Sequence, residues 1–240
     1  MRKFSLLLLS VVIIIISCND PRNKTISGNG ELVTDVRAIG ELKGVEVVGQ
    51  MNVYLLQGEA SSVKIEADKN LLEYLEIDLK GGVLTISTKE GYNLRPKAGL
   101  KIYVTSPVFN TISVVGSGDV QSQTKLTNSN DIEIDISGSG NVLLDVDAPR
   151  INSEINGSGT VTFKGNTKNF QSDINGSGEV HAFELLSETA EINISGSGNI
   201  EVFASKLLDV EIAGSGDIQY KGDPVVKQSK AGSGDIRKVQ

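Results

Sequence analysis

The chain has 240 residues, a hydrophobic content of 39% and a net charge of −7, which allows one large β domain or two small ones. Its acidic balance and the lack of a basic stripe exclude nucleic acid as a partner, because an acidic surface repels phosphate. Tryptophan is absent, aromatic residues make up 5% and there are 26 glycines, so the composition favours a stacked β core of Ile, Val and Leu over a helical bundle.

Residues 1–17 have the organisation of a signal peptide. Arg2 and Lys3 precede an apolar run from Leu6 to Ile16, which is shorter than the ~20 residues of a membrane-spanning helix. The segment Ile15-Ile16-Ser17-Cys18 resembles a bacterial lipobox, in which the signal is cut before a lipid-modified cysteine. We expect Cys18, the only cysteine, to anchor an outer-membrane lipoprotein on the periplasmic or the outer face. The alternative is an uncleaved N-terminal helix with an incidental cysteine.

Residues 18–24 are predicted to form a short lipid-anchored tether, and residues 25–107 an irregular N-terminal β region. Six runs of strand length lie between turn residues; they cover Val45–Val48, Asn52–Leu56, Val63–Ala67, Leu75–Leu79, Val83–Thr88 and Leu100–Thr105. One helical turn is expected at residues 68–74, with Asp68 as its N-cap. Pro107 marks the junction with the next region.

Residues 108–240 contain an internal repeat built on the tripeptide Gly-Ser-Gly. Its seven copies start 22, 19, 19, 20, 18 and 18 residues apart, at residues 116, 138, 157, 176, 196, 214 and 232. A repeat of this period is typical of solenoids. A β-branched residue lies two positions after each copy and, except for Lys230, two positions before it. This pattern predicts two strands joined by a glycine corner in every coil.

The alternation within a coil predicts which side chains face the core. In the fourth copy, Ile174 and Val180 point inward, whereas Asn175 and His181 point outward. Stacked corners require positive φ and no Cβ, which explains the glycines. The sequence therefore predicts an all-β protein with a parallel β-solenoid of about seven Gly-Ser-Gly coils. In the last coil, Gln228, Lys230 and Lys238 replace inward apolar residues and are expected to form a cap.

The repeated motif resembles that of the auto-transporter adhesin head GIN domain family. The resemblance rests on (Ile/Val)-x-Gly-Ser-Gly-(Asp/Asn/Thr/Glu)-(Val/Ile) and on three further segments, Gly44-Val45-Glu46-Val47, Val53-Tyr54-Leu55-Leu56-Gln57-Gly58 and Tyr220-Lys221-Gly222-Asp223-Pro224. It covers nearly the whole mature chain, although Leu42-Lys43 stands where members usually carry a Phe. The resemblance implies a right-handed β-helical fold in a bacterial envelope lipoprotein.

The sequence contains little that could support catalysis. His181 is the only histidine, and we expect it to be a solvated outward side chain. A Ser-His-Asp triad, a Cys-His pair and a histidine-based metal site are therefore unsupported. We predict that the chain is not an enzyme and has no cofactor. A polysaccharide-active enzyme that uses paired carboxylates is the third hypothesis for function.

Acidic residues recur at the outward position three residues before successive glycine corners. If the coils stack in register, Asp135, Glu154 and Asp173 form one column about 4.8 Å apart. One interpretation is that solvent or lysines such as Lys164 and Lys168 screen this column. Another is a weak stripe for a divalent cation or a polar ligand, with oxygens from the adjacent Asn156 and Asn175. A third is an error of register. The sequence alone does not decide whether this stripe holds a metal ion.

These observations lead to two hypotheses of different kinds. The first is a lipid-anchored, non-enzymatic binding protein that presents a repetitive polar surface to a glycan or another envelope component. The second is a structural envelope protein whose stacked edges mediate self-association into a homo-oligomer. The expected partners are the membrane, through the lipidated Cys18, and a glycan or envelope protein.

Overall fold

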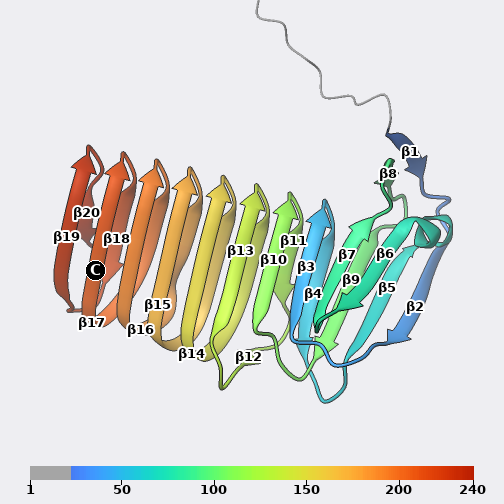
Figure 1. The fold of residues 1–240 in the computed structure, drawn as a ribbon, viewed down its shortest axis with the longest axis horizontal. Coiled ribbons are helices and arrows are strands. Elements are labelled where there is room, and N and C mark those ends of the chain that lie inside the picture. Colours follow the sequence, from blue (N-terminus) through green and yellow to red (C-terminus); the bar gives the residue numbers. More distant parts are fainter. Residues whose placement is uncertain (1–22) are drawn as a thin grey trace, which may run out of the picture.

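The computed structural model describes residues 23–240, and this part of the chain is almost entirely β structure (Figure 1). The predicted signal peptide, Cys18 and most of the tether lie outside the described residues. Within residues 23–240, no helix has the length and apolar character needed to cross a membrane.

The N-terminal region contains most of the short strands. Its elements are β1 (Lys24–Ser27), β2 (Leu32–Ala38), β3 (Gly44–Gly49), β4 (Asn52–Gln57), β5 (Ser62–Asp68), the 3-10 helix η1 (Lys69–Tyr74), β6 (Leu75–Lys80), β7 (Val83–Thr88), β8 (Tyr92–Arg95) and β9 (Leu100–Ser106). All six strands predicted here are present, as β3 to β7 and β9, whereas β1, β2 and β8 were not predicted.

The repeat region forms longer strands that continue around the bends. They are β10 (Thr111–Gly116), β11 (Asp119–Ser122), β12 (Leu126–Thr127), β13 (Ile132–Gly138), β14 (Asn141–Gly157), β15 (Thr160–Gly176), β16 (Glu179–Gly196), β17 (Asn199–Gly214), β18 (Asp217–Lys221), β19 (Val225–Gly232) and β20 (Ile236–Lys238). These strands stand side by side in parallel coils along the molecule (Figure 1). The predicted β-solenoid is confirmed.

The coils stack in register through their glycine corners. The first glycine of each corner is the ladder partner of the first glycine in the next coil, in the order Gly116, Gly138, Gly157, Gly176, Gly196, Gly214 and Gly232. The following serine donates its N–H to the preceding corner, as from Ser177 N to the Gly157 oxygen at 2.8 Å. Each corner is therefore bonded to the corner before it.

The stack also continues into the N-terminal β region. Strand β3 pairs in parallel with β10, so that Gly49 lies beside Gly116, and β4 pairs with β11 from Asn52 onward. A further coil thus precedes the first Gly-Ser-Gly corner. Its corner reads Gly49-Gln50-Met51, which lacks the serine and the second glycine by which the repeat was recognised.

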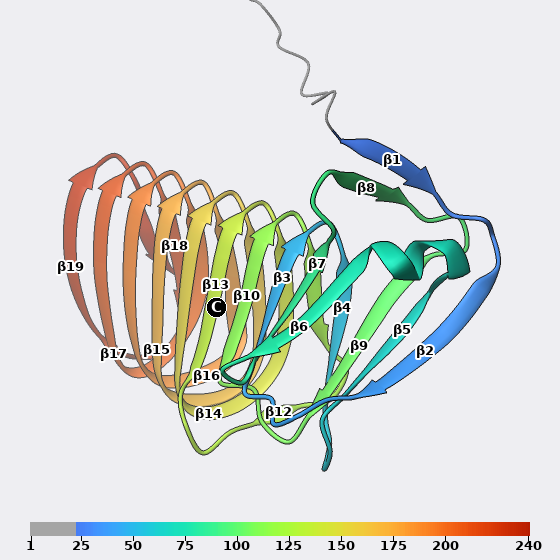
Figure 2. The ribbon, with the colours of Figure 1, turned by 45° about the vertical axis from the view of Figure 1, so that its right-hand side comes forward.

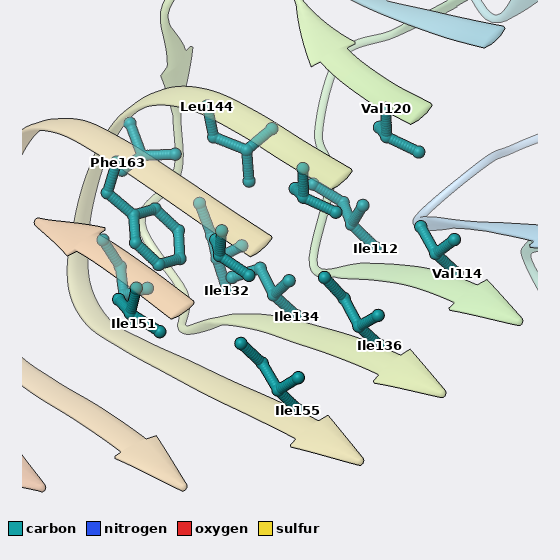
Figure 3. Close-up of a cluster of buried hydrophobic side chains, with 14 of the residues drawn as sticks. Ile112, Val114, Val120, Ile132, Ile134, Ile136, Leu144, Ile151, Ile155 and Phe163 are labelled. Atoms are coloured by element: carbon teal, nitrogen blue, oxygen red, sulfur yellow. The ribbon is translucent and has the colours of Figure 1, made fainter. Parts of the chain in front are cut away.

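The interior of the solenoid is a ladder of aliphatic side chains (Figure 3). The inward assignments are confirmed, since Ile174 is 1% and Val180 0% exposed. Only the last coil differs, because Ile236 is partly buried. The same inward positions are therefore buried in one coil after another until the stack ends.

Two phenylalanines interrupt the aliphatic core in one coil. Phe163 and Phe170 are buried and meet edge to face, with ring centroids 5.6 Å apart. Small side chains lie next to them: Ala190 is the ladder partner of Phe170, and Ser172 is two positions further along the same coil. Because interiors are close-packed, the small residues make room for the rings.

The N-terminal strands cover the first coil. Strands β7 and β9 pair in parallel with β3 and β4, and β6, β5 and β2 add antiparallel pairings (Figure 2). Strands β1 and β8 form a separate two-stranded parallel sheet. The N-terminal end of the stack is thus covered by a mixed β layer.

The predicted helical turn is present as η1, and Asp68 is its N-cap residue, but the carboxylate of Asp68 has another role. Its side chain makes no capping hydrogen bond to η1. The fully buried carboxylate instead accepts backbone N–H groups from Gly30 at 2.5 Å, Lys97 at 2.9 Å and Ala98 at 3.0 Å. Burial alone would raise the pKa of this carboxyl, but these donors outweigh it and lower the pKa. Asp68 therefore joins two loops to the end of β5.

The C-terminal end of the stack has a different covering. Strands β19 and β20 are edges, since β19 pairs with β17 and β20 with β18 on one side only. Lys230 occupies the position next to Ile212 and donates from Nζ to the Gly234 oxygen at 2.7 Å. In the corners up to Gly178 the equivalent oxygen accepts an N–H from the next coil, as from Asn199 to Gly178 at 3.0 Å. The lysine thus replaces the missing coil.

The inward ladder is expected to carry the stability of the stack, whereas the corner serines are not. Burial of an Ile stabilises by roughly 1.5–3 kcal/mol, and a buried unpaired carboxylate adds a further cost. We expect Ile174→Asp to unfold the stack or to lower its denaturation midpoint strongly, and Ser177→Ala, at an exposed site, to be nearly neutral. Equal midpoints in urea for the two variants would contradict the assigned alternation.

The last coil is expected to protect the protein against self-association. Deletion of residues 225–240 would expose the edge of β17 with its buried Leu208 and Ile212, and Lys227→Val with Lys230→Ile would remove the edge charges. Both variants should form concentration-dependent oligomers in light scattering. Variants that remain monomeric at the highest attainable concentration would show that the last coil has no protective role.

Candidate functional site

The predicted acidic column exists in the structure. Asp135 is the ladder partner of Glu154, and Glu154 is the partner of Asp173. The column continues in both directions through polar residues, with Ser113 and Glu46 before it and Asn193, Glu211 and Ser229 after it. The register is therefore the predicted one, and it extends over the additional first coil.

Two further columns flank the acidic one on the same outward face. Two positions earlier in the strands lie Glu133, Asn152, Gln171 and Glu191, and two positions later lie Ser137, Asn156, Asn175 and Ser195. We call the three columns from Glu133 to Ser195 the acid–amide face. The earlier column was not predicted, although the alternation that identified the acidic column also places its members outward.

Amide side chains connect the acidic groups within this face. Asn156 donates from Nδ2 to Glu154 at 2.8 Å, and Asn175 donates to Asn156 at 3.1 Å. Asp173 accepts from Gln171 at 3.0 Å and from Asn193 at 2.7 Å. These bonds run along and across the strands, so the face is a fixed array of polar groups.

Asp135 has the least favourable electrostatic environment in the face. Burial raises the pKa of its carboxyl, and the negative charges of Glu154 and Glu133 raise it further. These groups line a shallow hollow of about 310 Å³ together with Asn152, whose buried Oδ1 has no hydrogen-bond partner. The hollow therefore presents mainly acceptors.

The structure places Lys164 and Lys168 away from the column, which leaves solvent as the screen in that interpretation. Lys164 lies 3.6 Å from Asp145, outside the acid–amide face. Lys168 lines a separate groove at the lower bend. Within the described residues, neither lysine forms an ion pair with the acidic column.

His181 is outward, as predicted, and lies between two acids rather than in solvent alone. Its Nδ1 is 3.0 Å from Glu201 and its Nε2 is 3.5 Å from Glu179. Over residues 23–240, His, Cys, Asp and Glu side chains nowhere gather in a group of three or more that could hold a metal ion.

A second hollow, which was not predicted, crosses the lower bend of the coils. It has a volume of about 520 Å³ and is lined in part by Lys168, Leu186, Glu188 and Phe203. Leu186 is 50% exposed there. It lies where the coil is irregular, because the register between β16 and β17 shifts between Ala182 and Leu186.

The chain also matches a known family. Residues 41–224 match the family described as "Putative auto-transporter adhesin, head GIN domain". This match covers most of the chain, which therefore belongs to that family. None of the curated proteins matches the sequence.

Solved structures of similar proteins share the whole fold. A protein from Bacteroides fragilis named a putative adhesin has 27% identity and a TM-score of 0.84, with 89% of this chain and 100% of that chain covered. One from Parabacteroides distasonis named a putative lipid binding protein has 31% identity and a TM-score of 0.74, with 90% of this chain and 100% of that chain covered. Another from that organism named a putative adhesin has 27% identity and a TM-score of 0.73, over the same shares.

The raised pKa of Asp135 predicts a pH-dependent stability. A carboxyl whose pKa is higher in the folded than in the unfolded chain is destabilising once it ionises, so the cost is absent below the unfolded pKa of about 3.9 and present at neutral pH. Asp135→Asn should therefore raise the urea midpoint at pH 7 but not at pH 3. Glu211→Gln is the matched control, because its partners Asn193 and Ser229 are uncharged. An equal gain from both variants would contradict the crowding at Asp135.

Proposed function

We propose that this chain is an adhesin-like protein of the cell envelope, anchored through lipid on Cys18, which binds a glycan across the acid–amide face. The family and the solved relatives support the adhesin-like class. The anchor is supported by the succession of a basic start, an apolar run and the lone cysteine. An adhesin of this design would hold its solenoid away from the membrane as a rigid binding surface.

The observation that carries the proposal is the hydrogen-bonded array of amides and carboxylates. Sugar hydroxyls both donate and accept hydrogen bonds, so they need a surface that offers both. Asn156, Asn175 and Gln171 supply donors, and Glu154 and Asp173 supply acceptors. Because these groups are already held by one another, little side-chain entropy is lost on binding. The array repeats with every coil, as a polymer ligand also repeats.

A glycan fits this face better than a bare cation. Calcium takes six to eight oxygen ligands around one point. The acidic column spreads its carboxylates along the stack, and within residues 23–240 no three acidic side chains are grouped so that they could hold a metal ion. We therefore place the polar-ligand interpretation of Asp135, Glu154 and Asp173 before the cation interpretation.

The anchor is tested by Cys18→Ser in the native host. We expect the variant to lose incorporation of a fatty-acid analogue and to remain as an unprocessed or soluble form, because the acylated thiol is absent. Metabolic labelling followed by fractionation measures both effects. Equal labelling of wild type and variant would show that Cys18 is not the lipid anchor.

The binding face is tested on a glycan array with residues 19–240. The variant combining Asp135→Asn, Glu154→Gln and Asp173→Asn keeps the side-chain shapes but removes the acceptor charges, so binding should fall about tenfold or more. Lys168→Gln with Glu188→Gln, in the lower groove, is the control and should bind as wild type. Loss of glycan binding in the control alone would place the site in that groove. If wild type still binds the glycan after calcium is chelated, binding is direct and does not need a calcium ion as a bridge.

The second candidate function is self-assembly, for which β19 and β20, paired on one side only, are the available edges despite their lysines. It requires that the wild-type chain form concentration-dependent oligomers without a ligand. Saturable glycan binding by a monomer would support the adhesin-like function instead.

A further inference from the structure

The first glycine corner of the stack has no coil above it. Gly49 has a φ of +104°, as other corner glycines do, but nothing lies within 4 Å of the position where its Cβ would be. At Gly116 the same position lies 2.8 Å from the Gly49 oxygen. The N-terminal strands β7 and β9 continue the sides of the first coil but do not form a corner over it.

A hollow of about 810 Å³ occupies the place of the missing corner. Its walls are the corner itself, the end of β7, strand β8 and the turn that leads into β9. Thr25 of β1 also lines it. Strands β1 and β8 stand together beside the top of the first coil (Figure 2). Residues of both strands line the hollow.

One backbone donor of the corner has no partner, and it belongs to a residue that lines this hollow. In later corners the N–H that follows the first glycine donates to the coil before it, as from Ser117 to Gly49 at 3.0 Å. The equivalent N–H in the first corner belongs to Gln50. Within residues 23–240 it has no backbone acceptor, and Gln50 is one of the residues that line the hollow. Gln50 is exposed, so this N–H is free to bond an acceptor that enters the hollow.

The charge of the lining differs from that of the whole protein. The chain carries a net charge of −7, yet no Asp or Glu lines the hollow. Arg95 lines it and forms no ion pair within the described part of the chain. Asn52 and Asn93 add amide groups. An arginine fork, a free N–H and amides without a carboxylate are the donors that an oxyanion requires.

We propose that this hollow binds the phosphate group of a small ligand, with Arg95 and the Gln50 N–H as its principal donors. The phosphate is common to a phospholipid headgroup and to free inorganic phosphate. The volume exceeds what phosphate alone needs, and Met51, Leu94 and Leu100 provide apolar wall for the remainder of a larger ligand. The site lies apart from the acid–amide face, so it does not depend on the proposed glycan binding.

The test is calorimetric titration of the full chain, in an uncharged detergent, with inorganic phosphate and with glycerophosphoglycerol as the isolated headgroup. We expect saturable binding that weakens with salt. Tighter binding of glycerophosphoglycerol would assign the site to a phospholipid headgroup, and equal binding would assign it to free phosphate. Absence of binding for both probes would overturn the proposal.

Two variants of the exposed residues in the lining locate the site. Arg95→Gln removes the fork, and Asn93→Asp places a carboxylate in the hollow, so each should weaken binding about tenfold. Arg150→Gln, which removes an exposed arginine near Asp131, is matched in charge and should bind as wild type. Circular dichroism confirms that all three are folded. Unchanged affinity in Arg95→Gln and Asn93→Asp would overturn the assignment to this hollow.

Discussion

Backbone contact between stacked glycine corners is the constraint on which the rest of the structure depends. The first glycine of each repeat corner has φ between +118° at Gly116 and +144° at Gly232, which is strained for any residue with a Cβ. A side chain there would also collide with the carbonyl of the preceding corner. A shift of one residue between two coils would place the corner serine, which has a Cβ, against the carbonyl of the preceding corner. The corners therefore hold the coils in a single register.

The register then decides what lies on the outside of the solenoid. Asp135, Glu154 and Asp173 are stacked because their corners are stacked, although like charges at this spacing repel by about 1 kcal/mol per pair even in water. Amides next to Glu154 and Asp173 offset part of this repulsion by hydrogen bonding. Asp135 has no such partner among the described residues, and the pKa of its carboxyl is raised. The repulsion between the carboxylates is thus imposed by the register, and the amides hold the side chains of this face in a fixed arrangement.

The sequence predicts those parts of the fold that follow from repetition. The period of the glycines and the alternation around them identified the coils, the inward ladder and the acidic column, because each coil presents the same local pattern. The corner at Gly49 was missed because it is bonded like the others but lacks their sequence. The role of Asp68 was missed because its donors, Gly30, Lys97 and Ala98, are distant in the sequence.

The same limit applies to the sites. The acidic column could be predicted, since it needs only the alternation and the register. The lower groove arises from an irregularity in β16, and the N-terminal hollow from the way in which β1 and β8 stand beside the first corner. No local pattern encodes either arrangement. Repetition thus predicts the long faces of the molecule, whereas its irregular parts require the structure.

The two ends of the stack show how a solenoid deals with the groups that a missing coil leaves unbonded. Every internal corner receives N–H groups from one neighbour and gives its own to the other. At the C-terminal end the unmet groups are carbonyls, and Lys230 of the same chain bonds to that of Gly234. At the N-terminal end the unmet group is the Gln50 N–H, and the chain leaves a hollow there instead. Since the N-terminal end offers a free donor and the C-terminal end offers carbonyl acceptors, the N-terminal end is the one suited to a small anionic ligand. The long faces between the ends remain available to a polymer.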